Sequence, residues 1–482
     1  MPNTPTLAAL AADLESGRTN ARKLVDECLA KISDKSGEGA RAFVHVDVEA
    51  AIEAAKAMDR LREVRAAPSP FAGIPISIKD LFDIKGQVTR AGSRALDDSP
   101  PAESDAPVVS RLRRAGFILI GRTNMTEFAY SGIGINPHYG TPKSVWQRHA
   151  GHVPGGSSSG AAVSVADGMA HGALGSDTGG SCRIPAAYNG IVGFKPTQRR
   201  IPIEGGVPLS FTLDSFGPLA RTVECCAVLD AILADEPVRP LQARTVKGMR
   251  LAVPTIVALD DLDAHVSRSF EQALDTLSRQ GASIERIEVP EFLDVAVMNS
   301  KGGFAAAESY AWHRYLIESH GDVYDPRVSS RILRGQSITA ADYIDILEAR
   351  KSFIARAAVR FAPYDAVVMP TCAIAPPRIA DLADDHAFMK ANLLSLRNCT
   401  LTNMMDGCAI SLPCHRHGEA PVGFMLSAVG GSDRRIFELA AGVEAAFHVC
   451  PDFHRRCPGH DDAADARGRS GRDRGLDRAR SG

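Results

Sequence analysis

Residues 151–197, GHVPGGSSSGAAVSVADGMAHGALGSDTGGSCRIPAAYNGIVGFKPT, carry most of the information on structure and function in this chain. They contain two Gly-Gly-Ser units, at 155–157 and 179–181, and the small residues between them predict a helix over 157–169 and a strand over 172–176. Glycines directly before a serine permit backbone conformations that other residues avoid, and they let backbone N–H groups point at an anion. One such loop is usually a turn, but two of them joined by a helix and a strand indicate a functional site.

The segments on either side continue the alternation of helices and strands. The spacing of apolar residues predicts helices over 6–33 (with a break at 17–20), 45–64, 104–115 and 263–280. Short runs of β-branched and other apolar residues predict strands over 71–80, 116–121, 250–254 and 366–370. This order predicts an α/β fold whose sheet is covered by helices on both faces.

The chain shows no linker or internal repeat before residue 450, so we expect residues 1–450 to form a single domain. Beyond Pro458 the sequence is mainly Asp, Arg, Gly, Ala and Ser, with Leu476 as its one large apolar residue. Such a segment cannot bury enough surface to offset the entropy of ordering, so we expect the Arg/Asp/Gly-rich tail at 451–482 to be disordered. The same run suggests a shifted reading frame, a hypothesis that sequencing of the coding DNA tests.

The composition of the 482 residues argues against several classes of protein. Lys and Arg number 55 against 57 Asp and Glu, and this balance argues against a broad basic surface for nucleic acid. No apolar run reaches the roughly 18 residues that a membrane-spanning helix needs. The first apolar stretch contains charged residues, which argues against a signal peptide. Ten cysteines without a C-x-x-C pair suit a reducing compartment, so we expect a cytoplasmic protein.

A serine nucleophile needs a base, and no histidine lies within the second Gly-Gly-Ser loop. Lys79 ends the apolar run of a predicted strand, where burial would lower its pKa and make a neutral amine accessible near neutral pH. A strand-end lysine that reaches solvent, with Asp80 as a salt partner, is the ordinary alternative. Next to the candidate nucleophile Ser181, the backbone amides near Thr178, Gly179 and Gly180 are candidates for an oxyanion hole.

Four segments of the chain together resemble one known family. GIPISIKD, GRTNMTEFA, PGGSSSGAA and GSDTGGSCRIPA, in this order, are similar to the motifs of the amidase signature family of serine hydrolases. The resemblance extends from about residue 5 to 448 and is densest between 71 and 222. It implies an α/β/α sandwich with a large mixed β-sheet covered by helices on both faces.

The resemblance also implies roles for individual residues. The family's lysine falls on Lys79, its cis-serine on Ser157 and its nucleophile on Ser181. Its oxyanion hole falls on Thr178, Gly179 and Gly180, supporting positions on Asp177, Arg183 and Ser158, and its substrate pocket on Ala129. Asn124 and Glu127, just after a strand, are candidates for the same pocket or for a structural hydrogen-bonding role. The implied activity is hydrolysis of a small-molecule carboxamide to an acid and ammonia or an amine through an acyl-enzyme, with no metal or other cofactor.

The main alternative within the resemblance is the A subunit of glutamyl-tRNA amidotransferase, which has the same catalytic set and feeds ammonia from glutamine to a partner protein. Residues 300–355 lack an obvious match to the glutamine-binding pattern of that protein, so we rank an amidase first. The sequence is also compatible with a homodimer, and we expect neither nucleic acid nor a membrane as a partner. A binding protein with an inactive site is a third class, which the presence of all three catalytic residues disfavours.

Two further patterns offer other interpretations. Residues 156–160, GSSSG, match G-x-S-x-G, the nucleophile elbow of α/β-hydrolases, which would make Ser158 the nucleophile with candidates such as Asp365 and His415 as acid and base. That interpretation leaves the second Gly-Gly-Ser loop without a role. The stretch from Cys414 to His417, with His149 and His152, offers metal-ligand types, but short clusters without paired zinc spacing are usually incidental.

Overall fold

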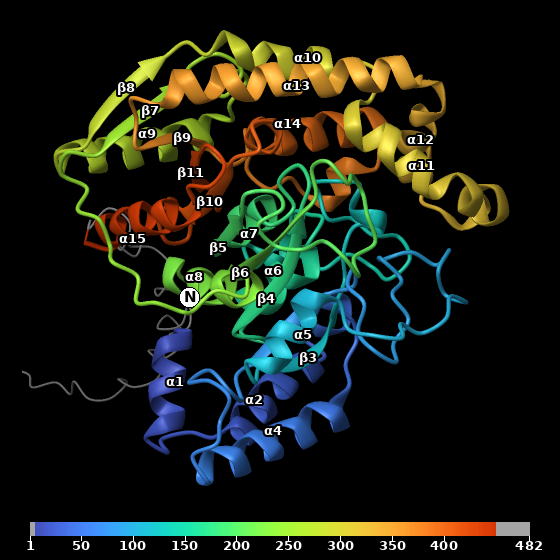
Figure 1. Ribbon diagram of the computed structural model, residues 1–482, viewed down its shortest axis with the longest axis vertical. Coiled ribbons are helices and arrows are strands. Elements are labelled where there is room, and N and C mark those ends of the chain that lie inside the picture. Colours follow the sequence, from blue (N-terminus) through green and yellow to red (C-terminus); the bar gives the residue numbers. More distant parts are fainter. Residues whose placement is uncertain (1–4, 450–482) are drawn as a thin grey trace, which may run out of the picture.

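The computed structural model describes residues 5–449, in which 11 strands form one sheet in the order β1-β3-β2-β4-β6-β5-β10-β11-β9-β7-β8 (Figure 1). The strands are β1 Phe43–His45, β2 Pro75–Lys79, β3 Ile118–Thr123, β4 Gly172–Asp177, β5 Val192–Lys195, β6 Ser215–Ala220, β7 Arg250–Pro254, β8 Ser283–Ile287, β9 Ala366–Pro370, β10 Cys408–Pro413 and β11 Gly423–Ala428. The tail at 451–482, expected to be disordered or frame-shifted, lies outside the described residues.

The sheet is mixed. β2 runs parallel to β3 and β4, and β7 runs parallel to β8 and β9. Between these two parallel groups, the strands from β4 through β6, β5, β10 and β11 to β9 pair antiparallel. The expected α/β fold with a large mixed sheet is therefore confirmed.

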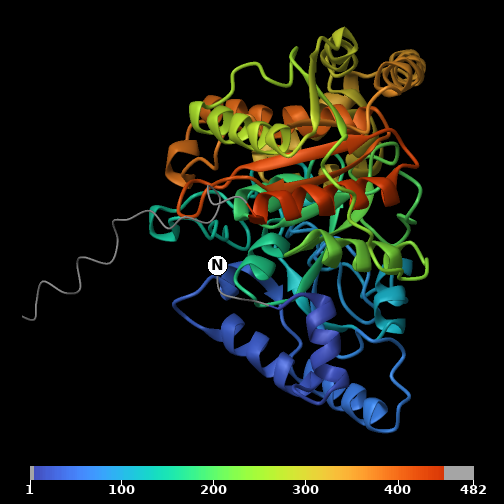
Figure 2. The same cartoon turned by 90° about the vertical axis from the view of Figure 1, so that its left-hand side faces the viewer.

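Helices lie around the sheet along its whole width. They are α1 Leu7–Glu15, α2 Ala21–Ser33, α3 Gly39–Ala42, α4 Val48–Glu63, α5 Pro107–Arg114, α6 Ser159–Ala166, α7 Arg183–Asn189, α8 Val223–Leu233, α9 Ala264–Arg279, α10 Leu293–Met298, α11 Gly303–His320, α12 Pro326–Leu333, α13 Ala340–Phe361, α14 Asp385–Met404 and α15 Asp433–Val449. The N-terminal helices α1, α2 and α4 lie at one end of the long axis, and α10 and α13 lie at the other (Figures 1 and 2).

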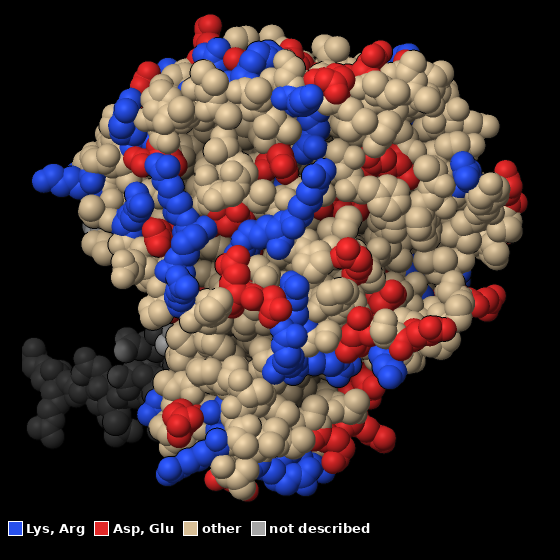
Figure 3. Space-filling model, in the orientation of Figure 1, with Lys and Arg blue, Asp and Glu red and all other residues tan. Residues whose placement is uncertain are grey.

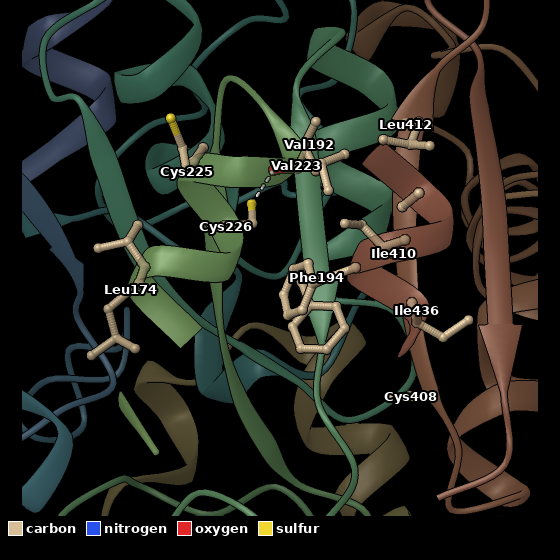
Figure 4. Packing of buried hydrophobic residues seen from close by; sticks show 14 of the residues in the cluster. Leu174, Val192, Phe194, Val223, Cys225, Cys226, Cys408, Ile410, Leu412 and Ile436 are labelled. Atoms are coloured by element: carbon tan, nitrogen blue, oxygen red, sulfur yellow. Dashed lines mark hydrogen bonds between the residues drawn. The ribbon is translucent and has the colours of Figure 1, made fainter. Parts of the chain in front are cut away.

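Alternate side chains of a strand pack against different helices on the two faces of the sheet. Ile410 of β10 lies in the same buried core as Val223 of α8 and Ile436 of α15, whereas its neighbour Ala409 belongs to the core on the α14 side. Figure 4 shows the first of these cores, with Phe194 and Ile410 pointing from their strands toward the helices. Burying one such large apolar side chain contributes about 1.5–3 kcal/mol, so the two cores hold the sheet rigidly between its helices.

Helix α6 consists of small residues because protein surrounds it, and all of its 8 residues are buried. Its Ser164 lies against β2, where the Oγ atoms of Ser164 and Ser77 are 2.9 Å apart. A Cβ on Gly160 would lie 2.1 Å from the carbonyl oxygen of Ala42, so this position requires glycine. The close packing brings the loop before α6 against the end of β2, which carries Lys79.

Most of the elements expected from sequence are present with shifted ends. The break at 17–20 separates α1 from α2, and the strand expected over 71–80 is β2. The helix expected over 157–169 begins only at Ser159, because the residues before it form the first Gly-Gly-Ser loop. Six strands were missed, namely β1, β5, β6, β8, β10 and β11. The strand β1 has only three residues directly before a long helix, and they show no alternation.

The surface carries charges of both signs. On the face shown in Figure 3, basic and acidic side chains are interspersed, in keeping with the formal net charge of −2. Within residues 5–449, no helix is long and apolar enough to cross a membrane. The cysteines of this part of the chain are all buried and free.

Candidate active site

Lys79 is a fully buried lysine at the end of β2. Its Nζ lies 2.7 Å from the hydroxyl of Ser157 and 2.7 Å from that of Ser176, and it makes no ion pair with any carboxylate in residues 5–449. Burial lowers the pKa of Lys79 to about 7, although the nearby Asp214 and Asp177 oppose the shift. A substantial fraction of the side chain is therefore a neutral amine near neutral pH.

The two ordinary explanations for this lysine do not hold. Lys79 does not reach solvent, and Asp80 is not its salt partner. Asp80 instead accepts a 2.7 Å hydrogen bond from Nε of Arg122 on the neighbouring strand β3. Successive side chains of a strand point in opposite directions, which separates Asp80 from the amine although the two residues are adjacent.

Ser157 is held in the loop between Pro154 and α6, and the peptide bond between Gly156 and Ser157 is cis. The serine is fully buried, and its carbonyl oxygen accepts a 3.1 Å hydrogen bond from the amide of Thr126. A Cβ on Gly156 would lie 2.6 Å from the backbone nitrogen of Gly134, so only glycine fits before the serine. The glycines of the first Gly-Gly-Ser unit thus allow Ser157 to enter a close-packed site.

Ser181 lies between β4 and α7 and is 3% exposed, whereas Ser157 is fully buried. The amide of Ser158 donates a 3.3 Å hydrogen bond to the carbonyl oxygen of Ser181, so the two Gly-Gly-Ser loops are directly joined. Among residues 5–449, no hydrogen bond connects the hydroxyls of Ser157 and Ser181. In resting enzymes such catalytic bonds are often long, and they shorten when the substrate binds.

The backbone N–H groups of the loop that contains Ser181 differ in whether they have a protein acceptor. The amides of Gly179 and Ser181 have no acceptor within the described part of the chain, which leaves them available to an anion. The amide of Gly180 differs, because it donates a 2.8 Å hydrogen bond to Oδ1 of Asp177. Gly180 therefore shapes the loop, with a φ of 131°, while its neighbours supply the free donors.

Asp177 and Arg183 form a fully buried ion pair beneath this loop. Two nitrogens of the guanidinium bind the two carboxylate oxygens, with Nη2–Oδ1 at 2.8 Å and Nε–Oδ2 at 3.0 Å. Burial alone would raise the pKa of Asp177, but Arg183 and the amide of Asn403 outweigh it and hold the pKa well below its usual range. Asp177 also accepts from the amide of Cys182, so the pair fixes the backbone on both sides of Ser181.

The remaining residues singled out from sequence have protein partners. Nδ2 of Asn124 donates to the carbonyl oxygens of Arg41 and Gly140, and the hydroxyl of Ser158 donates to the carbonyl oxygen of Ser176. The carboxylate of Glu127 is fully buried and binds three partners, the hydroxyl of Ser93, the ring of His138 and the amide of Asp325. Ala129 is buried with a φ of 60°, in a bent segment that Glu127 holds in place.

The structure does not assemble the nucleophile-elbow alternative. Ser158 is fully buried, with its hydroxyl bound to a backbone carbonyl. Nδ1 of His415 accepts from the amide of Val422, and Asp365 binds Arg250 and Arg435 at the start of β9. Within residues 5–449, no group of three or more side chains is placed to hold a metal ion, and the stretch from Cys414 to His417 forms no such group either.

Three buried polar residues of the site were missed from sequence. Ser176 accepts from Lys79, Asn403 of α14 binds Asp177 with Nδ2–Oδ1 at 3.0 Å, and Asp214 accepts a 2.5 Å hydrogen bond from the hydroxyl of Thr178. Ser176 carried a signal, since it is a polar residue in a strand between the two serine loops. Asp214 and Asn403 are distant in sequence from both loops and carried none.

Comparisons with known proteins agree with this architecture. A family model for amidases matches residues 23–437. The chain is 35% identical to 2-amino-5-chloromuconic acid deaminase of Comamonas testosteroni, over 91% of this chain and 96% of the relative. It is 32% identical to the A subunit of glutamyl-tRNA(Gln) amidotransferase from Streptomyces avermitilis, over 92% of this chain and 95% of the relative. A crystal structure of an amidase is similar with a TM-score of 0.83 at 30% identity, over 92% of this chain and 99% of its own.

These similarities, together with the mixed sheet, define a hydrolase that acts on amide C–N bonds. The chain belongs to the amidase signature family.

Proposed function

We propose that this enzyme hydrolyses a small carboxamide through Lys79, Ser157 and Ser181, releasing ammonia or an amine and a carboxylic acid. The observation that carries the proposal is the buried amine of Lys79, 2.7 Å from the hydroxyl of Ser157 and without a carboxylate partner in residues 5–449. A neutral lysine is a base strong enough to take a proton from a serine, and burial keeps a fraction of the Lys79 side chains unprotonated at physiological pH.

In the proposed mechanism, Lys79 takes the proton of Ser157 as Ser157 takes that of Ser181. The Oγ of Ser181 attacks the carbonyl carbon of the amide, and the amides of Gly179 and Ser181 donate to the developing oxyanion. Collapse of the tetrahedral intermediate breaks the C–N bond, and the proton returns along the same path to the leaving nitrogen. Water then attacks the acyl-enzyme while Ser157 and Lys79 take its proton, and the return of a proton to Ser181 frees the acid and restores the enzyme.

The supporting residues act on the geometry of the loop. Asp177 fixes the amides of Gly180 and Cys182 on either side of the nucleophile, and Arg183 neutralises its charge. Ala129 lies in the segment that we propose as a wall of the substrate pocket, with Asn124 and Glu127 as the residues that hold this segment. This division accounts for the protein partners of both polar side chains.

The relatives name two substrate classes to test. One relative is a deaminase of an amino-chloromuconic acid, and another is the A subunit of an amidotransferase. The experiment is an ammonia-release assay with a panel of aliphatic and aromatic carboxamides, glutamine and 2-amino-5-chloromuconic acid. We expect turnover of at least one simple carboxamide by the protein alone, and none by Ser181→Ala. Turnover of glutamine alone would favour the amidotransferase alternative, and activity retained by Ser181→Ala would overturn the proposed mechanism.

A further inference from the structure

Asp214 is a buried carboxylate that the proposed mechanism leaves without a role. It is 5% exposed, precedes the first residue of β6, and makes no ion pair with a Lys, Arg or His in residues 5–449. Its Oδ1 accepts from the hydroxyl of Thr178 at 2.5 Å, and its Oδ2 accepts from the amides of Leu209 and Ser210 at 3.0 and 3.1 Å. Burial raises its pKa to about 6, and the hydrogen bonds from Thr178, Ser210 and Leu209 oppose the shift.

Thr178 is the residue through which Asp214 touches the catalytic loop. It follows the last residue of β4 and directly precedes Gly179, whose amide is one of the free donors. The residue after Asp214 also contacts the end of β4. Ser215 lies opposite Asp177 in the β4–β6 pairing, and the hydroxyl of Ser215 donates a 2.8 Å hydrogen bond to the carbonyl oxygen of Asp177. The start of β6 therefore holds two successive residues of the loop from one side.

A second carboxylate anchors this segment to the helices. Oε2 of Glu308, on α11, accepts from the hydroxyl of Ser210 at 2.5 Å and from the amide of Thr212 at 3.0 Å. Its Oε1 accepts from the hydroxyl of Tyr343 on α13 at 2.5 Å. Residues 209–214 are thus held at both ends, by Glu308 toward the helices and by Asp214 toward the catalytic loop.

We infer that Asp214 is a positioning residue for the oxyanion hole, acting through the side chain of Thr178. The charge-assisted bond fixes the hydroxyl of Thr178, and with it the direction of the peptide unit that presents the amide of Gly179. An oxyanion hole works only if its donors are already aimed at the place where the charge develops. This inference rests on the proposed function, since it assigns Asp214 to the loop that serves Ser181.

A double-mutant cycle on Thr178 and Asp214 tests the inference without knowledge of the natural amide. The readout is the second-order rate constant for labelling of Ser181 by a fluorophosphonate, whose phosphoryl oxygen occupies an oxyanion hole. Thr178→Val and Asp214→Asn are each expected to lower this rate constant about 10- to 100-fold, somewhat less than the loss of a donor itself. The double variant is expected to be no slower than the slower single variant, while Thr178→Ser stays within about three-fold of wild type.

The matched control is Asp433→Asn. Asp433 is the first residue of α15 and accepts a 2.6 Å hydrogen bond from the hydroxyl of Thr197, so it forms the same kind of Thr–Asp pair outside both serine loops. Its labelling rate is expected to equal that of wild type. Labelling of Asp214→Asn at the wild-type rate, or multiplicative losses in the double variant, would overturn the inference while leaving the proposed function intact. If Asp214→Asn does not fold, the comparison of Thr178→Val with Thr178→Ser decides, and equal rates for these two overturn it. Wild-type protein that is not labelled on Ser181 would overturn the proposed function instead.

Discussion

Lys79 and Ser157 are joined by a 2.7 Å hydrogen bond inside a fully buried site, although they are 78 positions apart in the sequence. The bond links the end of β2 to the loop before α6, and the small residues of α6 allow the two to approach. Because no carboxylate in residues 5–449 pairs with Lys79, burial dominates its pKa. The relationship turns a normally charged side chain into a candidate base.

The first prediction concerns the pH dependence of the reaction. The base form of Lys79 is the neutral amine, and burial lowers its pKa to about 7 although the carboxylates of Asp214 and Asp177 oppose the shift. The value of kcat/KM is therefore expected to rise with pH, with a midpoint at about 7, and to level off above it. A profile that falls with rising pH across this range would contradict the assignment of Lys79 as the base.

Replacement of Lys79 gives a second prediction. Lys79→Ala removes the base and is expected to lower kcat by about 10²- to 10⁴-fold, and Lys79→Arg is expected to fail equally because a guanidinium stays charged. The exposed Lys85 serves as a control, and Lys85→Ala should keep wild-type activity. Steady-state kinetics on any turned-over amide measures both. Activity of Lys79→Arg near that of wild type would exclude proton transfer through this side chain.

The third prediction concerns the ion pair beneath the nucleophile loop. Arg183→Met leaves the buried carboxylate of Asp177 without a cation, and it is expected to lower the free energy of unfolding by about 3–5 kcal/mol. The exposed pair of Lys56 and Glu53 is a control, since Lys56→Met should cost less than about 1 kcal/mol. Urea unfolding followed by circular dichroism compares the two variants. A loss as small for Arg183→Met as for the control would contradict a structural role for the pair.

A fourth prediction isolates the shape of the oxyanion loop. A Cβ on Gly180 would lie 2.6 Å from Cβ of Cys399, and the φ of 131° disfavours any side chain, so Gly180→Ala must displace the loop. We expect a loss of activity of about 100-fold, as for removal of an oxyanion donor. Gly86 also has a positive φ but open space around it, so Gly86→Ala controls for backbone strain and should remain active. Equal activities of the two alanine variants would show that the close packing at Gly180 is unimportant.

The proposed catalytic trio could be picked out from sequence because each member lies in a local motif whose glycines, small residues and strand position are visible, and the role of Ser157 was implied by the family resemblance. Lys79, Ser157 and Ser181 all come from segments with such patterns. The alternation of helices and strands likewise predicted β2, β3, β4, β7 and β9 with the helices next to them, since periodicity is a local property, but most of the elements after residue 177 were not predicted. Strand order was not predictable, because β10 and β5 pair across more than two hundred residues with no local trace of the pairing.

The residues that position the loop could not be found in the same way. Asn403 binds Asp177 across 226 positions, and Asp214 binds Thr178 across 36. Each is one polar residue in an otherwise ordinary segment, and only the folded chain brings it to the site. The alternative pairing of Lys79 with Asp80 was wrong for a related reason. Asp80 is adjacent to Lys79 in sequence, but its side chain points in the opposite direction and binds Arg122 instead.

The most direct test of the account is the site at which a fluorophosphonate labels the purified enzyme. The probe reacts with an activated serine, and mass mapping of the labelled peptide distinguishes the neighbouring candidates. We expect label on Ser181, abolished in Ser181→Ala and strongly reduced in Lys79→Ala. Label on Ser158, or undiminished labelling when Lys79 is replaced, would contradict it.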